Sequence, residues 1–97
     1  LVATEEEPQI IQRDDVSWLI EGAAPLEDVM RALDIVDFPN SENYETIGGF
    51  MMYSLRKIPK KTDFVLFDRY KFEIIDTDNL KIDQLLVSLN PEAVKAE

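Results

Sequence analysis

The sequence contains neither cysteine nor histidine. These absences exclude disulfides, thiol nucleophiles, and zinc sites built from thiolate or imidazole ligands. The absence of histidine also removes the commonest general base, and with it the usual nucleophile–base pairs. No other set of nucleophile, base and oxyanion donors is visible, so we expect a protein that is not an enzyme and carries no cofactor.

Long hydrophobic runs are also missing. None approaches the roughly 20 residues that a membrane-spanning helix needs, so direct insertion of this chain into a membrane is not expected. No signal peptide is visible, and the chain begins with Leu1 rather than Met, which suggests a piece of a longer protein. A length of 97 residues suits one small domain.

Positive charge is scarce. Ten Lys and Arg residues stand against twenty Asp and Glu residues, which gives a formal net charge of −10. Residues 1–50 hold twelve of the acids and only two of the bases. Nucleic acid is therefore not an expected partner, because phosphate binding needs a basic surface. The acidic half serves either solubility or the attraction of a cation or a basic partner surface.

The hydrophobic pattern predicts an α+β domain with an antiparallel sheet and two helices over residues 9–89. Residues 1–8 are predicted to be a linker, and residues 90–97 a C-terminal tail with a frayed helical turn. In chain order, the predicted elements are a strand hairpin (10–13 and 17–21), two helices (25–33 and 47–57) and three strands (64–67, 70–75 and 80–89).

Several connections are predicted by local residue types. Asp68-Arg69 suits a two-residue hairpin turn, and residues 76–79 form a polar turn. The alternation of apolar residues slips near Asp83-Gln84, which indicates a β-bulge. In the loop between the helices, Phe38 is expected to anchor the chain to the core.

The second helix contains an unusual pair of glycines. Thr46 is a good N-cap, and Gly48 and Gly49 follow directly, although glycine costs roughly 1 kcal/mol in a helix interior. One explanation is room for a neighbouring backbone. The other is an anion or cofactor site at the helix N-terminus, made by Thr46, Gly48 and Gly49. The apolar face of this helix is predicted to contain Ile47, Phe50, Met51, Leu55 and Ile58.

Three acidic residues are candidate metal ligands. Asp14 and Asp15 lie at the predicted tip of the first hairpin, with Glu21 further along. Clustered carboxylates bind Ca²⁺ or Mg²⁺. The alternative is that the aspartates cap the turn with their own side chains.

Two other features have both a structural and a functional interpretation. Trp18, on the second predicted strand, is either a core residue or a stacking platform for a ligand. Lys57, Lys60 and Lys61, around Pro59, form either a solvated loop or a site for a phosphate or an acidic neighbouring domain.

Four stretches in the right order resemble the CorC/HlyC transporter-associated domain. They are residues 13–22 (RDDVSWLIEG), 44–49 (YETIGG), 56–59 (RKIP) and 72–75 (FEII). The resemblance implies a regulatory module at the cytoplasmic face of the cell membrane, in a parent protein with a membrane domain and CBS domains. It further implies magnesium or cobalt efflux, or a hemolysin-like parent.

Two positions depart from the pattern of that family. Val16 and Thr62 stand where the family usually has glycine, and a β-branched residue avoids positive φ. Each turn must therefore adopt another type or carry strain. Two functions remain open: a regulatory module of an ion transporter, with a homodimer as a further option, or a small-ligand sensor that binds a nucleotide or a divalent cation.

Overall fold

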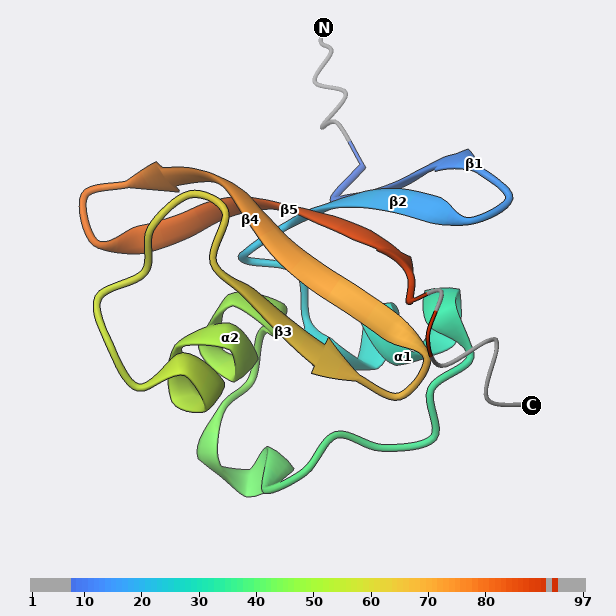
Figure 1. Cartoon of the computed structure of the whole chain (residues 1–97). Coiled ribbons are helices and arrows are strands. Elements are labelled where there is room, and N and C mark those ends of the chain that lie inside the picture. The colour runs from blue at the N-terminus through green and yellow to red at the C-terminus, as the bar shows by residue number, and fades with distance from the viewer. Residues whose placement is uncertain (1–7, 91, 93–97) are drawn as a thin grey trace, which may run out of the picture.

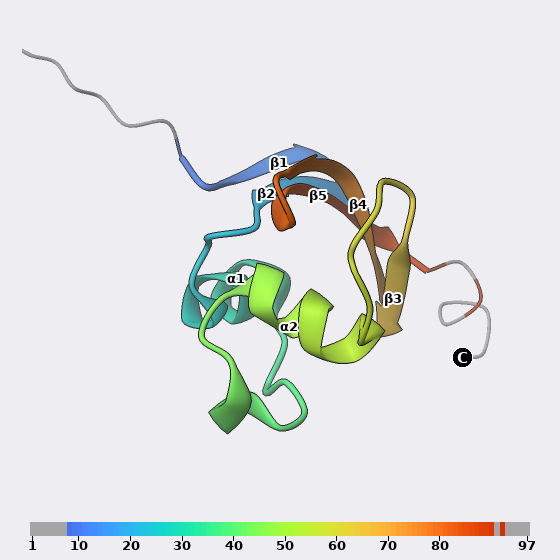
Figure 2. The same cartoon turned by 90° about the vertical axis from the view of Figure 1, so that its left-hand side faces the viewer.

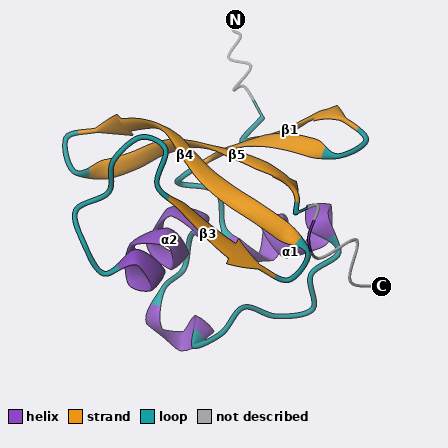
Figure 3. Cartoon of the chain, viewed as in Figure 1, coloured by secondary structure: helices purple, strands orange, loops and turns teal. Residues whose placement is uncertain are grey.

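A computed structural model gives the structure of the chain and describes residues 8–90 and residue 92. Most of the predicted linker and tail (residues 1–7, 91 and 93–97) lies outside the described residues. Figures 1 and 3 show the elements in chain order: β1 (Ile10–Asp14), β2 (Ser17–Glu21), α1 (Leu26–Leu33), a short 3-10 helix (Ser41–Asn43), α2 (Ile47–Leu55), β3 (Phe64–Phe67), β4 (Tyr70–Asp78) and β5 (Lys81–Leu89).

The five strands form one antiparallel sheet in the order β1-β2-β5-β4-β3. Both helices lie against the same face of this sheet, as the turned view in Figure 2 shows. The predicted fold class, an α+β domain with an antiparallel sheet and two helices, is therefore confirmed. The first hairpin and the last strand are neighbours in the sheet although they are far apart in sequence.

The core lies between the sheet and the two helices. Phe38 is 2% exposed and packs against the rings of Phe50, Phe67 and Phe72, so the predicted anchor of the inter-helix loop is confirmed. Trp18 is 8% exposed and meets the ring of Tyr70 edge-on, so it is a core residue.

The starts of the two helices are tied to each other. Pro25 is the N-cap of α1 rather than its first residue, and it forms an isolated β-bridge with Thr46, the N-cap of α2. The amide of Leu26 donates to the carbonyl of Glu45, and the amide of Ile47 donates to that of Ala24. These bonds satisfy helix N–H groups that have no partner within their own helix.

The second helix is shorter than its sequence predicts. We expected it to continue to Lys57, but it ends at Leu55, where Arg56 adopts the left-handed conformation (φ 56°). The Arg56 amide still bonds to Met52, which closes the last turn before Pro59 is reached. Ile58 is consequently off the helix and 62% exposed, so its assignment to the apolar face was wrong.

The β4–β5 hairpin extends beyond its predicted end. Residues 76–78, expected in a turn, continue β4, and the turn is made by Asn79 and Leu80. Leu80 is therefore 66% exposed and does not begin β5. The predicted bulge is present: the pairing steps from Asp76↔Gln84 to Thr77↔Ile82, which leaves Asp83 extra on β5. A matching irregularity at Ile75 on β4 restores the register.

The two turns that lack the usual glycine behave differently. In the first hairpin, the amide of Val16 donates to the Asp14 carboxylate, and no positive φ is needed at Val16. Before β3, Thr62 has a φ of 76°, a conformation that is strained for a β-branched residue. One turn has thus adopted another type, and the other carries strain.

Candidate functional site

The backbones at the end of β2, at the start of α2 and in β5 come into close contact at Gly22. The amide of Gly22 donates to the carbonyl of Asp83, and its own carbonyl accepts from the amide of Gly48, at 2.8 Å. A Cβ on Gly22 would lie 2.0 Å from the Ile82 carbonyl oxygen, and one on Gly48 would lie 2.8 Å from the Gly22 oxygen. Only hydrogen atoms fit between these chains, so the packing explanation holds for Gly48.

Gly49 has a different neighbour. A Cβ there would lie 2.9 Å from the Cβ of Tyr44, which is a side chain and not a neighbouring backbone. Its amide donates to the Thr46 hydroxyl at 3.1 Å, so Thr46 is the side-chain N-cap that the sequence predicted. The amides of Ile47 and Gly48 also have acceptors within the chain. The first three amides of α2 are therefore already bonded to protein oxygens.

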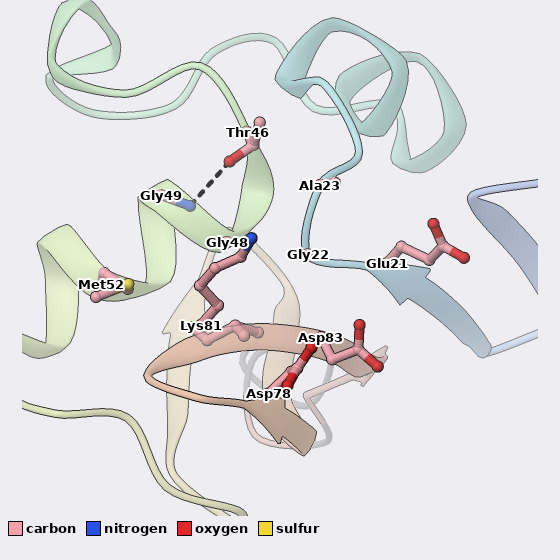
Figure 4. A pocket seen from close by; sticks show the side chains of 11 residues that line it. Glu21, Gly22, Ala23, Thr46, Gly48, Gly49, Met52, Asp78, Lys81 and Asp83 are labelled. Atoms are coloured by element: carbon pink, nitrogen blue, oxygen red, sulfur yellow. Dashed lines mark hydrogen bonds between the residues drawn. The ribbon is translucent and has the colours of Figure 1, made fainter.

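A pocket of about 380 Å³ opens beside this meeting point, and we name it the junction pocket. Figure 4 shows its lining, which comes from the end of β2, the start of α2 and the β4–β5 hairpin. Three of its residues, Thr46, Gly48 and Gly49, were the predicted cofactor site. Glu21, a predicted metal ligand, also lines the pocket, which further includes Gly22, Ala23, Met52, Asp78, Lys81, Ile82 and Asp83.

The junction pocket is acidic. The carboxylates of Glu21, Asp78 and Asp83 stand against the ammonium of Lys81, which gives a formal charge of −2. In Figure 4, Asp78 and Asp83 both extend from the β4–β5 hairpin, Lys81 extends toward the first turn of α2, and Glu21 points away from that helix. Because its charge is negative and the nearby helix amides are occupied, this lining suits a cation better than a phosphate.

The three predicted metal ligands are not brought together. Asp14 pairs with Ser17 at one end of β2, whereas Glu21 lies four residues further on, about 13 Å along the strand. The Asp14 carboxylate accepts bonds from the Val16 amide and the Ser17 hydroxyl, which hold the pKa of Asp14 below its usual value. Within residues 8–90 and 92, no group of three or more acidic residues is arranged to hold a metal ion.

Sequence reasoning missed Asp78, Lys81 and Asp83 as pocket residues. Residues 76–79 were predicted to form a turn, so the sequence did not predict that β4 continues to Asp78 and places this residue at the pocket. The break in the alternation of apolar residues at Asp83 could have pointed to the pocket. It marks a β-bulge, and a bulge redirects side chains at the end of a sheet.

The lysine-rich loop after α2 is held by an aspartate. Lys57 pairs with Asp63 at 3.1 Å, and the backbone amide of Lys60 bonds to the same carboxylate. These two bonds, of which the backbone bond has the larger effect, hold the pKa of Asp63 below its usual value.

In the part of the chain that the structure describes, no helix has the length and apolarity needed to cross a membrane.

Comparison with known proteins identifies several relatives. The chain is 67% identical to the polyamine export protein of Haemophilus influenzae over 95% of its length, and 64% identical to that of Escherichia coli K12 over 91%. These regions make up 21% and 20% of the two relatives, so the chain spans about a fifth of their length.

Solved structures of isolated domains share the fold. A CorC_HlyC domain from Haemophilus ducreyi is 79% identical, with a TM-score of 0.70 over 75% of this chain and 95% of that one. A domain of a Xylella fastidiosa hemolysin, solved in complex with Mg²⁺ and Mn²⁺, is 28% identical, with a TM-score of 0.73 over 84% of this chain and 98% of that one. Residues 11–91 match the family described as the transporter associated domain, CorC_HlyC. The chain therefore belongs to the CorC/HlyC transporter-associated domain family.

Proposed function

We propose that this domain is a non-catalytic regulatory module of a membrane transporter, at the cytoplasmic face of the cell membrane. The observation that carries the proposal is the 67% identity, over 95% of the chain, to about a fifth of a polyamine export protein. The rest of such a parent supplies the transport path. The partners of the domain would be the membrane domain and the CBS domains of the same parent protein.

The proposed cargo is a polyamine. Family resemblance alone pointed to magnesium or cobalt efflux, but relatives from Haemophilus, Salmonella and Escherichia at 62–67% identity are named for polyamine export. Sequence identity of this level over most of the chain indicates the cargo of the parent protein better than membership of the wider family does. Mg²⁺ and Co²⁺ are the competing cargoes to be tested.

A docked domain changes transport only by binding the conformations of the transporter unequally. Removal of the domain should therefore alter the rate of flux, or its regulation, without abolishing flux. The test is efflux of spermidine, Mg²⁺ or Co²⁺ from proteoliposomes that contain equal amounts of folded full-length protein or of protein truncated before Ile10. Spermidine flux at an altered rate would support the proposal, whereas complete loss of flux would make the domain part of the transport machinery.

A second candidate, ligand sensing, is favoured by the acidity of the junction pocket. Asp78 and Asp83 both line the pocket, and Met52 adds an apolar wall. Spaced ammonium groups on a methylene chain match such a lining, so a polyamine that is exported would also be sensed. Nucleotides fit less well, because their phosphates would meet a negative pocket.

Thermal melting tests this second candidate, because a ligand of the native state raises the midpoint. Spermidine, Mg²⁺, ATP and FAD would be added separately to the wild type and to an Asp78→Asn/Asp83→Asn double variant. The matched control is Asp34→Asn/Glu42→Gln, which removes the same charge away from the pocket. A spermidine shift that is lost only in the first variant supports sensing, and equal shifts in all three proteins refute it.

A further inference from the structure

The face of the sheet that points away from the helices carries a row of mostly apolar residues. Directly paired residues of an antiparallel sheet share a face, so the register places five residues side by side across all five strands. These residues are Ile11, Leu19, Leu86, Glu73 and Phe64. Ile11 and Phe64 are 44% and 48% exposed. Among the described residues, no helix covers this face (Figure 2).

A second row on the same face carries little net charge. It consists of Asp14, Ser17, Ser88, Lys71 and Leu66, one residue on each strand, and Leu66 is 54% exposed. Lys71 lies over the ring of Phe64 and 3.6 Å from the Glu73 carboxylate, so the two rows together keep one net negative charge, that of Asp14 on the edge strand β1. We call the two rows together the open face.

The helical side of the molecule, in contrast, is strongly acidic. From α1 to the start of α2, the only basic residue is Arg31. The acids there are Glu27, Asp28, Asp34, Asp37, Glu42 and Glu45. A partner that binds the helical side must be basic, and its binding must weaken as salt screens the charges. The open face has only one net negative charge and suits a largely apolar partner, whose binding resists salt.

The size of the open face indicates what kind of partner covers it. Two rows on five strands spaced about 4.8 Å apart span roughly 20 Å by 10 Å. Stable complexes of free proteins bury about 800 Å² on each partner, which is more than this patch offers. A partner joined by the same polypeptide needs less area, because tethering holds it at an effective concentration in the millimolar range. About four-fifths of the length of the polyamine export relatives lies outside this domain.

We propose that the open face is the docking surface for another domain of the same polypeptide, which presents an apolar surface without excess negative charge. This inference shares with the proposed function only the premise that the chain is part of a longer protein. A structural readout therefore tests it independently of any transport activity.

Hydroxyl-radical footprinting of side chains is a suitable test. The 97-residue chain at low concentration is compared with the full-length parent in detergent micelles, at low salt and at 1 M NaCl. Phe64 and Leu66 report on the open face, and Met52 and Ile58 are exposed reporters elsewhere. We expect oxidation of Phe64 and Leu66 to be at least about fivefold slower in the parent at both salt concentrations, with Met52 and Ile58 changed less than twofold.

Two substitutions in the parent sharpen the result. Leu66→Glu should return the oxidation rate of Phe64 to that of the isolated chain, whereas Ile58→Glu should leave Phe64 protected. Equal oxidation of Phe64 in parent and isolated chain would overturn the proposal. So would protection that disappears at 1 M NaCl, or that requires a lipid bilayer in place of detergent. Protection that develops in the isolated chain at high concentration, with a dimer mass in the ultracentrifuge, would assign the face to a second copy instead.

Discussion

Gly48 sits in α2 because it lacks a side chain and not because of backbone freedom. None of the three glycines has a positive φ. Helix propensity alone predicts that Gly48→Ala stabilises the domain by about 1 kcal/mol. The structure predicts the opposite sign, because the new Cβ would lie 2.8 Å from the backbone oxygen of Gly22. We expect a loss of about 1–3 kcal/mol, as in other overpacked sites.

Urea unfolding followed by Trp18 fluorescence measures this change. Ser54→Ala, on the exposed side of the same helix, is the control and should be neutral or slightly stabilising. If Gly48→Ala raised the urea midpoint as Ser54→Ala does, the close contact between α2 and Gly22 would be disproved.

Thr62 stores strain that can be removed. Its φ of 76° is rare for a β-branched residue, and glycine adopts it freely. We expect Thr62→Gly to stabilise the domain by about 1 kcal/mol, after the greater flexibility of glycine in the unfolded chain is included. Thermal unfolding should show a higher midpoint, whereas Thr62→Ala, which keeps the Cβ, should show a smaller gain. A lower midpoint for Thr62→Gly would contradict the strained turn.

The carboxylate of Asp63 holds the connection between α2 and β3. Asp63 accepts bonds from the Lys60 amide and the Lys57 ammonium, which lower its pKa below the usual 3.8. A lowered pKa in the folded state contributes stability above about pH 4, and this contribution is lost as the pH falls through the folded-state pKa. Asp63→Asn should therefore be less stable than the wild type at pH 7, with a difference that shrinks toward pH 3.

Urea midpoints between pH 7 and pH 3 test this prediction. Asp15→Asn, an exposed change of the same charge at the tip of the first hairpin, serves as the control and should show little difference at either pH. A constant difference between Asp63→Asn and the wild type across this range would show that the Asp63 charge does not hold the loop.

The elements that sequence predicted well are those with strong local signals. The period of apolar residues located both helices and all five strands, and Thr46 was identified as an N-cap from its residue type. The end of α2 was missed because Arg56 turns left-handed, which residue preferences do not indicate. The length of β4 was missed because Asp76 and Asp78 resemble turn residues, yet β5 pairs with them across two compensating bulges.

The candidate site was only partly predictable for a related reason. Thr46, Gly48 and Gly49 lie within four consecutive residues and reach the junction pocket together. Asp78, Lys81 and Asp83 join them only through the pairing of β4 with β5 and the contact at Gly22. Long-range contacts of this kind depend on the tertiary fold, which a local pattern does not specify.

The two sides of the domain differ in charge and polarity. The helical side is acidic, whereas the open face is largely apolar and has one net negative charge. We propose that this asymmetry serves function, because the domain would dock through its open face and thereby tune transport by the parent protein. Such docking should alter flux only through its unequal affinity for the conformations of the transporter.

Spermidine efflux from proteoliposomes that contain the full-length Leu66→Glu parent tests this claim most directly. Wild type, Ile58→Glu and the truncation before Ile10 are measured beside it at equal amounts of folded protein. We predict that Leu66→Glu retains flux but has the rate and regulation of the truncated protein, whereas Ile58→Glu behaves as the wild type. Wild-type rate and regulation in Leu66→Glu, with the truncation clearly altered, would contradict the claim that the open face carries the regulatory contact.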